Sequence, residues 1–201
     1  MDRKTILIVV DGLGFQAASS CMGFLLGMVE AGRASLYRME CELPSVSRPL
    51  YECILTGTPP VESGIVHNNI VRNSHHESIF SLAKQAGKTG AAAAYHWVSE
   101  LYNSAPYRPA FDRFTIDPAK TIPYGCFYHR DDYPDDHVFL DAEWLRQRYN
   151  PDFLLIHPMG IDHTGHLYGG ESSQYRNAVR MIDAVISDFI PGWIHEATKS
   201  L

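Results

Sequence analysis

The stretch Thr5-Ile6-Leu7-Ile8-Val9-Val10-Asp11-Gly12-Leu13-Gly14 carries the clearest signal for the fold. Its first six residues are β-branched or apolar without a break, which is typical of a strand buried on both faces of a parallel sheet. Similar patterns predict strands at 89–94 and 153–156, and a weaker one at 35–41. Apolar residues at helical spacing, with glycine or proline near the ends of the segments, predict helices at 20–31, 49–56, 78–86, 141–148 and 173–190. Strands that alternate with helices indicate an α/β fold with a mostly parallel sheet.

The length and composition suit one packed domain. The 201 residues are 45% hydrophobic and 20% charged, which is the balance of a globular chain with a core. The stretch at about 102–134 is rich in Pro, Tyr and Asp and has no clear period. We expect it to be an irregular insertion or substrate cover within a single domain spanning 1–201.

The charge pattern excludes several classes of partner. There are 17 Lys and Arg against 23 Asp and Glu, a formal charge of −6, with no basic run for a nucleic acid. The apolar runs are far shorter than the roughly 20 residues of a membrane-spanning helix, and also too short for a signal peptide of the usual kind. We therefore expect a cytoplasmic location, no membrane partner, and four cysteines that act as small apolar side chains.

The turn after the first strand allows more than one interpretation. Gly12-x-Gly14-x-x-Ala17 matches the dinucleotide-binding fingerprint, which would indicate a nucleotide-dependent oxidoreductase. Asp11 weakens that hypothesis, because a carboxylate just before the first glycine would repel a pyrophosphate. The other interpretation is a plain Asp-Gly turn without any chemistry.

Ser47 precedes or begins the helix predicted at 49–56. A serine at this place is most often a capping residue. The same place favours a phosphate or a serine alkoxide, because the helix N-terminus offers free N–H groups and the positive end of the dipole. Asn68, twenty-one residues later, is either a turn residue or an amide donor to a phosphoryl oxygen.

A third cluster follows the strand predicted at 153–156. Three histidines and an aspartate lie within 157–166, and Asp162 and His166 are four residues apart. A carboxylate and an imidazole in a glycine-punctuated segment at a strand end favour a metal site over a plain surface segment.

Together, these clusters resemble the alkaline phosphatase superfamily, and most closely its type I phosphodiesterase/nucleotide pyrophosphatase branch. The similarity extends from Thr5 to about Trp193. The matching motif residues, in order and spacing, are Asp11, Ser47, Pro49, Thr56-Gly57, Gly64-Ile65, Asn68, Asp162, Gly165 and His166.

The resemblance implies an alkaline-phosphatase-like three-layer α/β/α fold and a metal-dependent phosphoryl-ester hydrolase acting on a small phosphorylated substrate. Ser47 would be the nucleophile, and Asn68 would stabilise the phosphoryl oxygens. Two divalent ions, zinc or alternatively manganese, would be bound, one by Asp11 and the Ser47 oxygen, the other by Asp162 and His166.

Two departures from the family pattern qualify this expectation. Arg48 stands where nucleotide-cleaving relatives carry an aromatic residue, and we expect it to bind an anionic part of the substrate. The Asp-His-Gly triplet and the further histidine ligand that the family carries after the last predicted helix are not found. The expected fold is therefore incomplete at its C-terminus, and an incomplete or degenerate non-catalytic member of the same fold stays an alternative. A sheet edge exposed in this way would also favour a homo-oligomer.

Overall fold

The computed structural model describes residues 4–199, with side chains as far as 196, and the chain forms two compact units. The first, here called the sheet unit, comprises residues up to 9 together with 40–130 and 140–157. The second, the helical unit, comprises 10–39, 131–139 and the residues from 158 onward. The expectation that 1–201 acts as a single domain stays a prediction.

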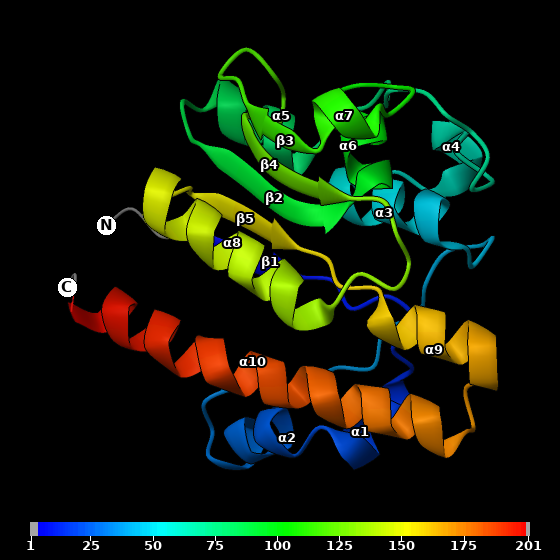
Figure 1. Ribbon diagram of the computed structural model, residues 1–201, viewed down its shortest axis with the longest axis vertical. Helices are drawn as coiled ribbons and strands as arrows, with labels where there is room; N and C mark the ends of the chain where they lie inside the picture. The colour runs from blue at the N-terminus through cyan, green and yellow to red at the C-terminus, as the bar shows by residue number, and fades with distance from the viewer. Residues whose placement is uncertain (1–3, 200–201) are drawn as a thin grey trace. The chain divides into compact units, whose positions relative to one another are not determined.

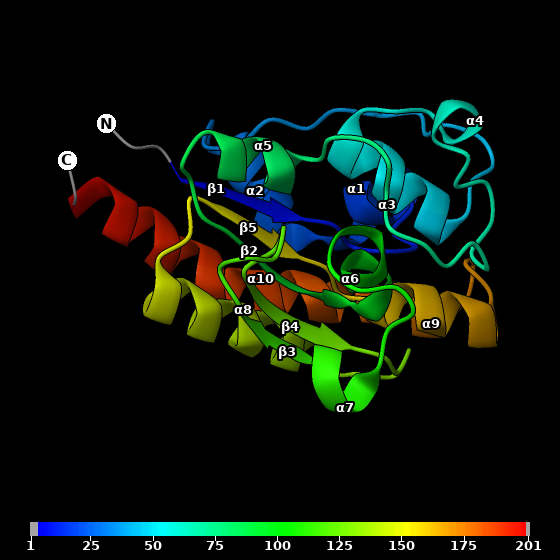
Figure 2. The ribbon, with the colours of Figure 1, turned by 90° about the horizontal axis from the view of Figure 1, so that it is seen from above.

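The sheet unit is built on five strands in the order β1-β5-β2-β4-β3, which can be followed in Figure 2. All neighbours pair in parallel except β3, an antiparallel edge strand, so the predicted mostly parallel sheet is confirmed. The strands are β1 (Thr5–Ile8), β2 (Gly90–Tyr95), β3 (Phe114–Ile116), β4 (Tyr124–Tyr128) and β5 (Phe153–Ile156).

Besides residues 140–149 of α8 (Asp135–Tyr149), which lead from β4 to β5, five helices belong to the sheet unit and are labelled in Figure 1. They are α3 (Ser47–Thr56), α4 (Pro60–Ser63), α5 (Ile79–Gln85), α6 (His96–Tyr102) and α7 (Pro109–Asp112). α3 and α5 lie close to their predicted bounds, because capping residues next to each helix fix one of its ends. α3 ends at Gly57, whose φ of 72° is the left-handed conformation of a helix C-cap. Ser78 and Ser81 form a capping box that begins α5.

The main core of the sheet unit lies between the sheet and helices α3, α5 and α6. β2 is the central strand, and its side chains are unusually small, because residues 91–94 are four fully buried alanines. Small strand residues let aromatic rings come close. A Cβ added at Gly90 would lie 2.8 Å from Cδ1 of Phe80, a ring of α5.

The helical unit contains α1 (Phe15–Cys21), α2 (Gly23–Glu30), α9 (Gly160–Tyr168), α10 (Ser173–Lys199) and the first residues of α8 (Asp135–Tyr149). Figure 1 shows α1 and α2 along the length of α10. Asp183 of α10 accepts the N–H groups of Phe24 and Leu25, at 2.7 and 3.2 Å, and so fixes the start of α2. No helix within residues 4–199 is long and apolar enough to cross a membrane.

The segment at 102–134 is not the irregular insertion that the sequence predicts. It supplies β3 and β4, and β4 pairs with the central strand β2. The sequence Tyr-Gly-Cys-Phe-Tyr hides this strand, because it has no β-branched residue and contains a glycine. Gly125 is needed there, since a Cβ at this position would lie 2.2 Å from Cε2 of Phe127.

Several other predicted bounds are wrong. The helix expected at 20–31 is the pair α1 and α2, and no strand forms at 35–41. α8 begins six residues earlier than predicted. α10 continues through Pro191, because a proline removes one helical N–H bond without ending a helix that packing holds.

Candidate functional site

Asp11 lies on a tight turn at the start of the helical unit. The N–H of Leu13 donates to the carbonyl of Val10 at 3.4 Å, and Gly12 has a φ of 70°, the conformation that a type II turn requires at its third residue. The carboxylate of Asp11 accepts the N–H of Gly12 at 2.9 Å. The turn thus holds the Asp11 side chain against its own backbone.

Gly12 brings this turn into direct contact with Asp162. A Cβ built at Gly12 would lie 2.6 Å from Cα of Asp162 and 2.9 Å from its Cβ and N atoms. Only a glycine permits so close an approach. The structure therefore brings together two of the predicted metal ligands, Asp11 and Asp162, which are far apart in the sequence.

Asp162 and His166 lie on successive turns of α9, where residues four apart share one face. The imidazole Nε2 of His166 is 3.4 Å from Oδ2 of Asp162, and the histidine ring is mostly exposed. Burial and the negative charge of Asp11 raise the pKa of Asp162, partly offset by His166. A carboxylate in this environment is stabilised by a nearby cation.

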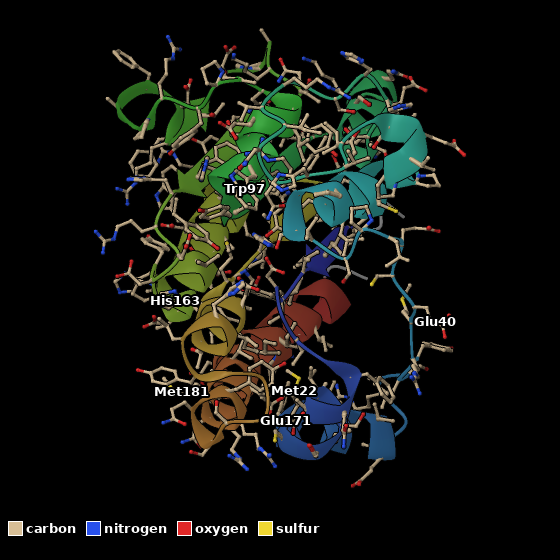
Figure 3. All side chains as sticks on the ribbon, turned by 90° about the vertical axis from the view of Figure 1, so that its right-hand side faces the viewer. Met22, Glu40, Trp97, His163, Glu171 and Met181 are labelled. Atoms are coloured by element: carbon tan, nitrogen blue, oxygen red, sulfur yellow. The ribbon has the colours of Figure 1, made fainter. Side chains whose placement is uncertain are left out.

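The helical unit also has a cavity of about 530 Å³ between segment 131–136 and helices α9 and α10. Four aspartates of that segment line it, and the charge of one of them, Asp131, also raises the pKa of Asp162. Figure 3 labels His163 of α9 and Met181 of α10, which line the same cavity. The negative charge around Asp162 therefore extends beyond Asp11.

The donor set of this cluster fits part of a divalent metal site. Two carboxylates and one imidazole are oxygen and nitrogen ligands that suit zinc or manganese. Within residues 4–199, however, no three His, Cys, Asp or Glu side chains are arranged so that they could hold an ion by themselves. Asp11, Asp162 and His166 therefore supply only part of a coordination sphere.

Ser47 and Asn68 lie next to each other in the sheet unit. Ser47 is the first residue of α3, it is half-buried, and an extended residue, Val46, precedes it. The N–H of Arg48 donates to Oδ1 of Asn68 at 2.9 Å, so the asparagine caps the helix that begins with the serine. Because the oxygen of Asn68 faces this N–H, the rest of its amide is an NH₂ donor, the group that a phosphoryl oxygen needs.

The structure buries Arg48, which the sequence analysis expects to bind an anionic part of the substrate. Its side chain is 1% exposed, its Nη2 donates to Oε2 of Glu100 at 2.6 Å, and its Nη1 donates to the carbonyl of Ile70. The guanidinium also lies 4.8 Å from the centre of the Trp97 ring. A group enclosed in this way has no exposed surface to offer a substrate, so we interpret Arg48 as a buried anchor of α3.

Two residues of the cluster are not found by the sequence analysis. Tyr175 of α10 donates its hydroxyl to the carbonyl of Gly12 at 2.7 Å and accepts the N–H of Gly14 at 3.0 Å. Asp135 accepts the N–H of Gly160, the first residue of α9, at 3.0 Å, and burial raises its pKa. The available signal is a tyrosine on the apolar stripe of the last predicted helix, because a buried hydroxyl needs a hydrogen-bond partner.

The comparison with protein families decides between the interpretations of the sequence. The model of the type I phosphodiesterase/nucleotide pyrophosphatase family matches residues 5–195. The chain belongs to this family. The oxidoreductase hypothesis is not favoured, because the contact with Asp162 explains Gly12, and the family match covers the whole turn.

Relatives of this family member include the GPI ethanolamine phosphate transferase 2 of Kluyveromyces lactis, which is 26% identical over 191 residues. That match covers 92% of this chain and 23% of the transferase, so the chain spans about a quarter of that relative's length.

Solved structures show the same fold. Murine ectonucleotide pyrophosphatase/phosphodiesterase 5 superposes with a TM-score of 0.71 at 13% identity, covering 96% of this chain and 53% of the murine one. Phosphonoacetate hydrolase of Sinorhizobium meliloti, in complex with phosphonoacetate, gives 0.63 at 16% identity, covering 92% and 52%. The predicted alkaline-phosphatase-like fold is thereby confirmed.

Proposed function

We propose that the protein is a metal-dependent phosphoryl-ester hydrolase that cleaves a phosphodiester or a pyrophosphate-type substrate through Ser47. The observation that carries the proposal is the contact between the Asp11 turn and Asp162, two carboxylate-bearing segments pressed together through Gly12. Such a contact concentrates negative charge at one place. Membership of the phosphodiesterase family supports the binding of a divalent ion as the function of this charge.

In the proposed reaction, the Oγ of Ser47 loses its proton and attacks phosphorus, and the bond to the leaving alcohol or phosphate breaks. The leaving group takes up a proton, and water then cleaves the phosphoserine. The start of α3 favours the developing negative charge through its dipole. The NH₂ group of Asn68 is the proposed donor to a phosphoryl oxygen.

Family members generally depend on divalent metal ions, and Asp11, Asp162 and His166 are the residues proposed to hold one. A bound ion would supply positive charge to a phosphoryl oxygen and lower the pKa of an oxygen nucleophile. We propose zinc, with manganese as the alternative, because the donors are oxygen and imidazole without thiolate.

A second candidate function is transfer to an alcohol in place of water. The name of the Kluyveromyces lactis relative supports it, because that protein is an ethanolamine phosphate transferase. The first step would be unchanged, and the hydroxyl oxygen of an acceptor, in place of water, would attack the phosphoserine while Ser47 takes back a proton.

The test is the loss of turnover on replacing one hydroxyl group. In the full-length protein, Ser47→Ala should lower the hydrolysis of bis-p-nitrophenyl phosphate at least a hundredfold, while circular dichroism and the unfolding midpoint stay unchanged. Ser45→Ala is the matched control, because Ser45 is an exposed serine two residues earlier. Retention of activity in Ser47→Ala, together with its loss in Ser45→Ala, would reassign the nucleophile. Adding an alcohol acceptor separates hydrolysis from transfer.

A further inference from the structure

We propose that Tyr175 is a positioning residue for the divalent-ion site, holding the Asp11 turn in register with Asp162. This inference rests on the proposed function, because it concerns the same carboxylate pair. The hydroxyl group of Tyr175, which makes the hydrogen bonds to the turn, is the part of the side chain that we assign this role.

The hydroxyl of Tyr175 bridges the two ends of the turn. It donates to the carbonyl of Gly12 at 2.7 Å and accepts the N–H of Gly14 at 3.0 Å, so one oxygen atom uses both its donor and an acceptor site on this segment. Tyr175 itself is 6% exposed, which shields both hydrogen bonds from competing water.

These two bonds are shorter than the backbone bonds of the turn. Leu13 donates to Val10 at 3.4 Å, and Asp11 donates to the carbonyl of Pro158 at 3.2 Å. Because hydrogen bonds weaken as they lengthen, the bridge from Tyr175 contributes a large part of the constraint on this turn.

The ring of Tyr175 reaches the second ligand-bearing segment as well. A Cβ added at Gly165, one residue before His166, would lie 3.5 Å from Cδ2 of the tyrosine. One side chain of α10 therefore touches both the turn that carries Asp11 and the helix that carries Asp162 and His166.

The contacts of Tyr175 matter for metal binding because the carboxylates of Asp11 and Asp162 repel each other. The contact between Gly12 and Asp162 holds the two carboxylate-bearing segments against each other, and like charges held close repel unless a cation lies between them. A turn free to move would separate the carboxylates and lower the affinity for an ion that needs both. Hydrogen-bonded partners around metal ligands typically change metal affinity by about 10–100-fold.

The test compares Tyr175→Phe with the parent and with Tyr168→Phe, all in the full-length protein. Phenylalanine keeps the ring against α9 and removes only the bridging oxygen. Tyr168 is the matched control, because it is an exposed tyrosine at the end of α9. Manganese affinity is measured by calorimetry, hydrolysis as a function of manganese concentration, and amide exchange of residues 11–16 by hydrogen–deuterium exchange without metal.

We expect Tyr175→Phe to bind manganese about 10–100-fold more weakly and to exchange the Gly14 amide faster, with its turnover restored at saturating manganese. Tyr168→Phe should match the parent in all three measurements. Unchanged manganese affinity in Tyr175→Phe would overturn the positioning role while leaving the proposed function intact. A turnover that saturating manganese does not restore would also overturn it. A parent protein that binds no manganese and keeps its activity would refute the metal site and this inference together.

Discussion

Replacing Gly12 by alanine is the most direct way to test whether the carboxylate cluster depends on the approach of one backbone to another. The new Cβ would lie 2.6 Å from Cα of Asp162, whereas carbon atoms in contact are about 3.5–4.0 Å apart. One of the two segments must therefore move by about 1 Å. An added methyl in a filled space typically costs about 1–3 kcal/mol. The left-handed φ of 70° adds about 1–2 kcal/mol for a residue with a Cβ.

Gly32→Ala is the control that separates these two costs. Gly32 lies in the same helical unit and has a φ of 67°, but a Cβ there would meet no atom within 4 Å. Urea unfolding of the metal-free proteins should show a loss of about 1–2 kcal/mol for Gly32→Ala and about 2–5 kcal/mol for Gly12→Ala. Only Gly12→Ala should also weaken manganese binding. Equal losses of stability and equal affinities in the two variants would refute the close contact between Gly12 and Asp162.

Three further predictions concern other parts of the chain. Arg48→Met should lower the unfolding free energy by about 3–5 kcal/mol, because it leaves the charge of Glu100 buried, and adding Glu100→Leu should restore most of that loss in urea unfolding. Asp162→Asn should stabilise the metal-free protein at neutral pH. The folded pKa of Asp162 is raised, so the charged carboxylate destabilises the fold above that pKa, and the penalty disappears as the pH falls through it. Thermal melting from pH 4 to 7 should show the two proteins converging toward the acid end. Zinc titration of the 201-residue chain should find fewer than two tightly bound ions, because a catalytic zinc normally takes three protein ligands. Two tight ions per chain would show that this count of ligands is wrong.

Much of the site's framework follows from local sequence. The continuous apolar runs of β1 and β5 predict both strands closely, and these strands are neighbours in the sheet. Asp11 comes three residues after β1 and Asp162 comes six residues after β5, and the segments that carry them meet through Gly12. Their role as metal ligands stays a prediction. Gly57 similarly marks the end of α3. In each case the residues that allow the prediction lie in, or directly next to, the element that they predict.

The errors arise where a partner is distant in the sequence. Arg48 is buried because Glu100 is available fifty-two residues later, and no property of its own neighbourhood indicates this ion pair. Tyr175 meets Gly12 across 163 residues. β4 was missed because its glycine looks, from the sequence alone, like the glycine of a loop, and its pairing with the distant strand β2 leaves no local signal. Long-range contacts decide these positions, and periodicity contains no information about them.

The alanine strand β2 has a consequence for how this protein tolerates mutation. Ala91, Ala92, Ala93 and Ala94 are fully buried, so neither face of the strand has room for a larger side chain. Each added branch would cost about 1–3 kcal/mol, a large part of the stability of a typical domain. A saturation library of the gene should therefore tolerate almost no substitutions at these four codons, while the exposed Phe114 and Ile116 of β3 vary freely. The central strand is therefore the part of the sheet that tolerates substitution least, although none of its residues takes part in the proposed chemistry.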